Sequence, residues 1–159
     1  MDNIELNKVR EYFSAVAEAE AAVGEFYALC HEYWPDEELW PKIAAEEAVH
    51  AGAVRKMLEL VAKSPDSFAV LKPLSPTPVR LFIEGVKANA AKVRGMVYNK
   101  TNAMAVSRDL EQSIIESRYD QLLACADPAY KALAGGLTAD SRVHKEKFSA
   151  RLATLGIAK

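Results

Sequence analysis

Two residues that can bind a metal ion, Glu47 and His50, stand on one face of a predicted helix whose other residues are apolar. Members of this face recur at steps of three and four residues: Trp40, Ile43, Glu47, His50, Val54, Met57 and Val61. Such spacing is typical of a helix side packed into a core, so both polar groups are expected to be buried. A buried carboxylate needs a partner. Because Glu-x-x-His on one helix face binds metal ions in helix bundles, the pair predicts a metal site.

A further carboxylate, Glu20, interrupts a second apolar face in the N-terminal part of the chain. This face follows the same steps and consists of Leu6, Val9, Phe13, Val16, Glu20, Val23, Tyr27 and Cys30. Glu20 is therefore expected to be buried rather than half-exposed. Gly24, one residue beyond Val23, weakens the helix slightly but allows a neighbouring helix to pack closely.

The C-terminal half of the chain repeats this pattern with Glu111 and His144. When His144 is placed on His50, apolar residues coincide at Leu133 and Leu39, Leu137 and Ile43, Phe148 and Val54, and Leu152 and Leu58. Asp140 then falls on Glu46, and Ser141 falls on Glu47. The two halves are therefore expected to face each other with Glu20, Glu47, His50, Glu111 and His144 converging. The carboxylate that would complete the repeat is missing at Ser141.

The elements that must position these residues are helices. Helical spacing, capping residues and proline breaks predict helices over residues 3–32, 37–62, 79–97, 103–126 and 129–155. The last one is expected to be interrupted at Gly135 and Gly136 and capped again near Thr138. No segment of convincing length alternates with period two. The expected class is all-α: one domain over residues 1–159, a four-helix bundle with a long connection between its second and third helices.

These residues resemble the motif of the ferritin-like di-iron carboxylate proteins, and in particular their rubrerythrin-like branch. In that motif a Glu on the first helix is followed by Glu-x-x-His on the second, Glu on the third and Glu-x-x-His on the fourth. Glu20 with Phe26-Tyr27, residues 39–50, and residues 105–119 with Glu111 are similar to its first three helices. Ser141 departs from the motif in the fourth helix. The two cysteines are too few for the rubredoxin-type domain of full rubrerythrins.

The resemblance implies two iron ions held by Glu20, Glu47, His50, Glu111 and His144. It also implies oxidation of ferrous iron or reduction of peroxide, with oxygen or peroxide as substrate, electrons from a separate donor protein, and a homodimer. By the same resemblance Tyr27 is the candidate catalytic residue near the metals; its alternative role is that of a packing residue with a hydrogen-bonding hydroxyl. Manganese would accept the same nitrogen and oxygen donors. A single-metal site at Glu20, Glu47 and His50 is a further alternative.

A second function stays open beside this one, a degenerate ferritin-like module that serves binding or assembly. Glu47 and His50 would then be a buried hydrogen-bonded pair without metal. Conversely, Asp140 would replace the carboxylate missing at Ser141 if the helix shifted near Gly135. Glu46 and Glu25 are expected to be solvated.

The amino-acid composition argues against nucleic-acid-binding and membrane-spanning proteins. The chain has 159 residues, half of them apolar, and a net charge of −2. It contains no basic block that would indicate nucleic-acid binding and no apolar run that could span a membrane. The N-terminus lacks the pattern of a signal peptide, and Cys30 and Cys125 are expected to be reduced, so a cytoplasmic location is expected.

Overall fold

The computed structural model describes the backbone of residues 1–117 and 121–156, and the side chains of residues 1–114 and 121–156. Within these residues the chain is mostly helical, and the predicted all-α class is confirmed. Its helices are α1 (Asn3–Tyr33), α2 (Leu39–Lys63), α3 (Pro76–Arg94), α4 (Lys100–Ser117) and α5 (Pro128–Thr154), with a short 3₁₀ turn at Pro65–Ser67. Two short strands, β1 (Phe68–Val70) and β2 (Leu123–Cys125), complete the described elements.

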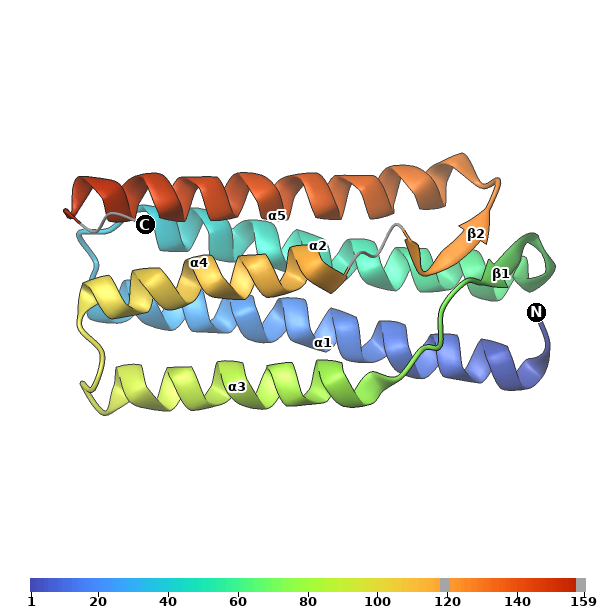
Figure 1. The fold of residues 1–159 in the computed structure, drawn as a ribbon, viewed down its shortest axis with the longest axis horizontal. Helices are drawn as coiled ribbons and strands as arrows, with labels where there is room; N and C mark the ends of the chain where they lie inside the picture. Colours follow the sequence, from blue (N-terminus) through green and yellow to red (C-terminus); the bar gives the residue numbers. More distant parts are fainter. Residues whose placement is uncertain (118–120, 157–159) are drawn as a thin grey trace.

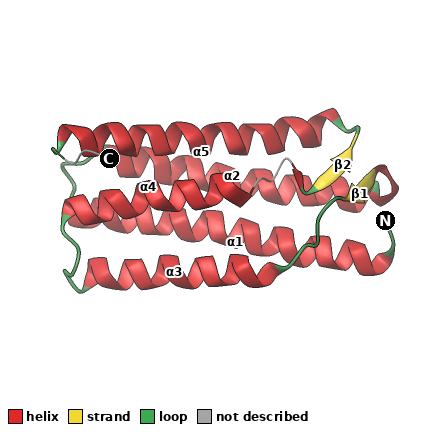
Figure 2. Ribbon diagram, in the orientation of Figure 1, coloured by secondary structure: helices red, strands yellow, loops and turns green. Residues whose placement is uncertain are grey.

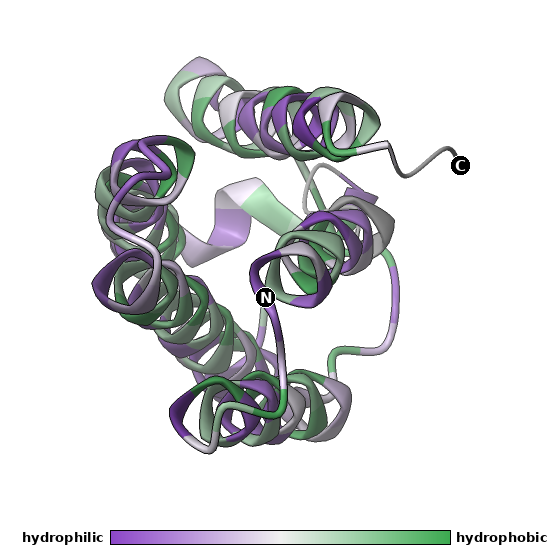
Figure 3. Ribbon diagram, turned by 90° about the vertical axis from the view of Figure 1, so that its left-hand side faces the viewer, coloured by the Kyte–Doolittle hydropathy of each residue, from purple (hydrophilic) through white to green (hydrophobic). Residues whose placement is uncertain are grey.

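The helices lie side by side along one axis (Figure 1). Helices α1 and α2 form one hairpin, α4 and α5 form a second, and the two hairpins contact each other mainly through α2 and α5. Helix α3 belongs to the long predicted connection and packs along α1. Each helix carries both hydrophobic and hydrophilic residues along its length (Figure 3), as expected for helices that bury one side.

Local sequence signals explain where the two longest helices begin. Asp2 caps α1: its carboxylate accepts a hydrogen bond from the Glu5 amide at 2.8 Å, while the Glu5 carboxylate accepts one from the Asp2 amide at 3.2 Å. At the start of α5, the Asp127 carboxylate accepts hydrogen bonds from the amides of Ala129 and Tyr130. These caps anchor the elements that carry Glu20 and His144.

The small β-ribbon was not predicted. Strands β1 and β2 are antiparallel, with Phe68 opposite Cys125 and Val70 opposite Leu123 (Figure 2). The prediction of a helix over residues 103–126 is therefore wrong at residues 123–125, and its residues 118–120 lie outside the described part of the chain. A three-residue strand is too short to show period two, and its pairing depends on a partner far away in the sequence. The ribbon ties the segment after α2 to the segment before α5.

The predicted interruption at Gly135 and Gly136 is also wrong. Helix α5 runs without a break from Pro128 to Thr154, and added Cβ atoms at both glycines would meet nothing within 4 Å. Each glycine costs a helix about 1 kcal/mol relative to alanine. Burial of the adjacent Ala134 and Leu137 outweighs that cost, because both are core residues.

The core contains both apolar faces identified in the sequence. Every member of the face from Trp40 to Val61 and of the face from Leu6 to Cys30 is buried, their polar residues included. No helix in the described part of the chain is long and apolar enough to cross a membrane.

Candidate metal centre

The carboxylate of Glu47 lies between two imidazole rings that come from different helices. Its Oε2 atom is 3.1 Å from Nδ1 of His50 on α2, and its Oε1 atom is 2.9 Å from Nδ1 of His144 on α5. All three side chains are almost completely buried, with Glu47 at 0% exposure. One ligand atom from each residue lies within 4.8 Å of the others, so a single ion could reach all three. The Glu47 carboxylate thus presents one oxygen to each histidine.

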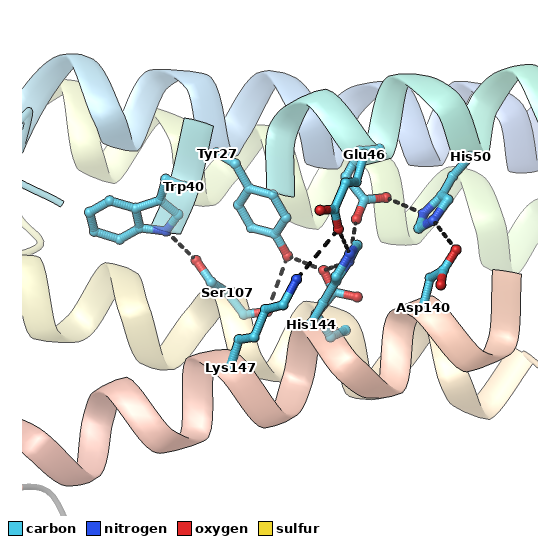
Figure 4. A network of polar contacts seen from close by, with 10 residues as sticks. Tyr27, Trp40, Glu46, His50, Ser107, Asp140, His144 and Lys147 are labelled. Atoms are coloured by element: carbon cyan, nitrogen blue, oxygen red, sulfur yellow. Dashed lines mark hydrogen bonds and ion pairs between the residues drawn. The ribbon is translucent and has the colours of Figure 1, made fainter. Parts of the chain in front are cut away.

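The outward nitrogens of the two histidines are paired with acids at the rim of the cluster. Nε2 of His50 lies 3.3 Å from Oδ2 of Asp140 on α5, and Nε2 of His144 lies 2.5 Å from Oε2 of Glu46 on α2 (Figure 4). Asp140 and Glu46 are 60% and 47% exposed. Metal-bound histidines usually have such a partner on the second nitrogen, which orients the ring and makes it a better ligand.

Sequence reasoning missed the contact of Glu46 with His144, and it expected Asp140 as a replacement ligand rather than as a partner of His50. Glu46 is exposed to solvent, as expected, but its carboxylate also contacts His144 and lies 3.7 Å from Lys147 Nζ. Asp140 reaches the cluster without any shift of α5, as a partner of His50. The sequence does contain a sign of these contacts, because an acid stands four residues before each histidine. In the structure each acid pairs with the histidine of the other hairpin.

Glu111 reaches the same cluster from α4. Its Oε1 atom accepts a 2.7 Å hydrogen bond from the Tyr27 hydroxyl and lies 3.6 Å from Nδ1 of His144. Its Oε2 atom is buried and has no hydrogen-bond partner among the residues that the structure describes. A buried carboxylate oxygen in that state is costly. The Oε2 atom of Glu111 is therefore available to a cation that enters the cluster.

Glu20 approaches the cluster from α1. It is 1% exposed, and a hydrogen bond with its carboxyl group contributes to lowering the pKa of Glu47. The two helices come close together here because of Gly24, as the sequence predicted. A Cβ atom at Gly24 would lie 3.1 Å from Cβ of Glu47 and 3.3 Å from the Ala44 carbonyl oxygen. Gly24 therefore lets α1 pack directly against the helix turn that carries Glu47.

Ser141 is buried beside His144 and supplies no carboxylate. The structure thus brings the five predicted ligands, together with Tyr27, to one buried region. Three of them, Glu47, His50 and His144, have ligand atoms close enough together to bind one ion. Glu111 contacts this set through His144. Glu20 contacts it through Glu47.

Glu47 and the two histidines stabilise one another's charged forms without a metal. Burial would lower the pKa of His144, but Glu111 and Glu47 outweigh it and raise that pKa to about 10. Burial would likewise raise the pKa of Glu47, but the contacts with His144 and His50 hold it well below its usual value. The pKa of His50 is also raised, because Glu47 outweighs the effect of burial. Protonated histidines therefore supply the positive charge that the carboxylates require.

The chain as a whole matches no model of a known protein family, no characterised protein and no solved structure at a significant level.

Proposed function

We propose that the protein binds a transition-metal ion through Glu47, His50 and His144. The observation that carries this proposal is the arrangement of the two histidines. Both Nδ1 atoms face the oxygens of one buried carboxylate, and both Nε2 atoms face an acid that can hold the ring in place. Two imidazoles and a carboxylate are a common donor set for iron, manganese and zinc.

Two further carboxylates support a second ion in the same place. Glu111 has a buried oxygen without a partner among the described residues, and Glu20 lies against Glu47. Together with Glu47 they give three buried carboxyl groups, enough negative charge to offset much of the charge of two divalent ions. We therefore propose a di-metal site of the rubrerythrin-like kind, which Glu20, Glu47, His50, Glu111 and His144 would hold and to which Ser141 would contribute no carboxylate.

When bound, iron would supply electron transfer for the oxidation of ferrous iron by oxygen or for the reduction of peroxide. The residues of this chain hold the ions, neutralise their charge and exclude bulk water, because the inner side chains are nearly completely buried. By the same resemblance we propose a separate protein as electron donor and a homodimer as the assembly. Manganese fits the same donors and stays an alternative to iron.

The direct test is metal stoichiometry. Metal-free protein is titrated anaerobically with ferrous iron, and bound iron is counted after removal of the excess. We expect about two ions per chain, as the di-iron template requires. His144→Ala is expected to lose tight binding. The matched control is His31→Ala, since His31 lies on α1 and contributes nothing to the cluster. Binding of no iron would overturn the proposal, and one ion per chain would restrict it to Glu47, His50 and His144.

One observation favours a second candidate, a module without a metal. Both nitrogens of both histidines already lie within 3.3 Å of a carboxylate oxygen, so the cluster is a connected ion-pair network as it stands. In that case the Glu47→Ala, His50→Ala double variant should retain the cellular role of the protein if it folds. Loss of that role in a folded double variant would contradict the metal-free module.

A further inference from the structure

The two tryptophans of the chain contact each other at the end of the α1–α2 hairpin. Trp34 follows α1 and is half-buried, whereas Trp40 lies in the first turn of α2 and is completely buried. Their ring centroids are 5.6 Å apart, and the rings are inclined by 37°. Tyr33 lies beside Trp34, with ring centroids 6.1 Å apart. An aromatic contact thus leads from the surface into the core.

Ser107 on α4 connects Trp40 with Tyr27. The indole N–H of Trp40 donates a 2.9 Å hydrogen bond to the Ser107 hydroxyl, and that hydroxyl donates to the Ala103 carbonyl at 2.9 Å. The Tyr27 hydroxyl lies 3.2 Å from the carbonyl oxygen of the same serine. Figure 4 shows Trp40 and Tyr27 on either side of Ser107. Both aromatic residues are therefore held by one short segment of α4.

Tyr27 in turn reaches the candidate metal centre. Its hydroxyl has one proton, and the shorter of its two contacts is the 2.7 Å bond to Glu111 Oε1. Tyr27 is completely buried. Contacts thus run from half-buried Trp34 through Trp40, Ser107 and Tyr27 to a carboxylate of the cluster.

We propose that Trp34, Trp40 and Tyr27 form a path for single electrons between the protein surface and the Glu/His cluster. A one-electron reductant at the surface would feed Trp34, and an oxidised transition-metal ion in the cluster would be the acceptor. The identity of this acceptor rests on the proposed function. The path itself depends on the positions of the three aromatic side chains.

Each step moves one electron from a reduced ring to an oxidised one. Oxidised Trp40 keeps its indole proton, because its hydrogen-bond partner is a serine hydroxyl, which is a weak base. When Tyr27 gives up an electron, its O–H bond breaks and the proton passes along the 2.7 Å hydrogen bond to Glu111 Oε1. Reduction of Tyr27 by Trp40 returns the proton. The net change is one electron moved from the surface reductant to the acceptor.

The path can be tested in the metal-free protein, where a failure of metal binding has no influence. A ruthenium(III) polypyridyl ion generated by a light flash serves as oxidant in solution. It draws electrons outward from Tyr27 to Trp34, so the same path is followed in the reverse direction, and transient absorption follows the radicals. The Tyr33→Phe variant is the background, because Tyr33 contacts Trp34 and would trap the radical. With two tryptophans in the chain, any tryptophanyl signal belongs to Trp34 or Trp40. We expect this signal to decay while a tyrosyl signal grows.

Three variants in this background assign the path. Tyr27→Phe is expected to abolish the tyrosyl growth and prolong the tryptophanyl signal. Trp34→Phe, at a half-buried position, is expected to lower the yield of both radicals. Tyr130→Phe is the matched control, because Tyr130 is equally buried but packs on Phe13 and Phe68 away from the cluster.

Unchanged tyrosyl growth in folded Tyr27→Phe would overturn the proposal, as would an unchanged radical yield in folded Trp34→Phe. Circular dichroism establishes that each variant is folded. A prolonged tryptophanyl signal in Tyr27→Phe together with unchanged kinetics in Tyr130→Phe would support it.

Discussion

The imidazole rings of His50 and His144 lie stacked, with centroids 5.3 Å apart and planes inclined by 23°, although one belongs to α2 and the other to α5. Two protonated rings at this distance repel each other, and the charge on His144 indeed opposes the rise in the pKa of His50. The pair tolerates protonation because the Glu47 carboxylate contacts both rings. A metal ion bound to the Nδ1 atoms would displace protons and take over their electrostatic role.

The stability of the metal-free protein should depend on the protonation of His144. Its pKa is raised to about 10, above the ordinary value of about 6.5, so the folded state binds this proton more tightly than the unfolded state. The resulting stabilisation is fully present below the ordinary pKa and is lost as the pH rises through about 10. Urea unfolding at a series of pH values should show this decline. His144→Gln should show a flatter profile, and identical slopes for the two proteins would contradict the assignment.

The rim acids Glu46 and Asp140 should strengthen metal binding without touching the metal. Glu46→Gln and Asp140→Asn remove the negative charge that pairs with each Nε2 atom while keeping the size of the side chain. Changes of this kind typically weaken metal binding by roughly 10- to 100-fold. Competition with a chelator measures the affinity. Glu59→Gln is the control, since Glu59 is an exposed acid on α2 that pairs with Lys56. Equal affinities in all variants would show that the rim acids do not support the histidines.

The close approach of α1 and α2 at Gly24 predicts a position-specific cost. In Gly24→Ala the added methyl group would stand 3.1 Å from Cβ of Glu47 and 3.3 Å from a backbone oxygen, so α2 would have to shift by a few tenths of an ångström relative to α1. We expect a loss of about 1–3 kcal/mol in the free energy of unfolding. Gly52→Ala, on the open side of α2, should instead be neutral or stabilise by up to about 1 kcal/mol. Denaturant titration distinguishes the two, and equal stability would contradict the packing argument.

Because Ser141 supplies no carboxylate, we expect that an acid at this position would strengthen metal binding. Ser141→Asp places an acid beside His144 at the position that matches Glu47 in the half-repeat. The added charge should tighten the binding of the proposed second metal ion, because it offsets cationic charge in a buried site. Stepwise titration with ferrous iron reads out this change. Ser141→Ala, which adds no charge, serves as control. If folded Ser141→Asp binds the second equivalent of iron no more tightly than the unchanged protein does, position 141 faces away from the proposed second ion.

The sequence predicted the burial of the candidate site residues better than it predicted the connections between the helices. Steps of three and four residues identify the buried side of a helix, and on that basis Glu20, Glu47 and His50 were expected to be buried, as they are. Glu111 had no clean apolar face around it, yet it too is buried, and its place was inferred from the repeat.

The failures concern features that local spacing does not contain. The β-ribbon requires Phe68 and Cys125 to meet, and the Ser107 contact requires α4 to lie beside Trp40. The contact of Glu46 with His144 was missed because the position of Glu46 on α2 does not tell how far away α5 lies. The continuity of α5 at Gly135 depends on burial at neighbouring positions rather than on the glycine itself. Each of these depends on how the helices lie relative to one another.

The exchange of acids between the hairpins has a consequence for how the site is assembled. The histidine of each hairpin is oriented by the acid of the other, Glu46 for His144 and Asp140 for His50. In a fragment that consists of one hairpin, the histidine would therefore lack the acid that pairs with its Nε2 atom. The complete site therefore forms only when the two hairpins have docked against each other. An ion bound at this junction would link the two hairpins, because its ligands come from both α2 and α5.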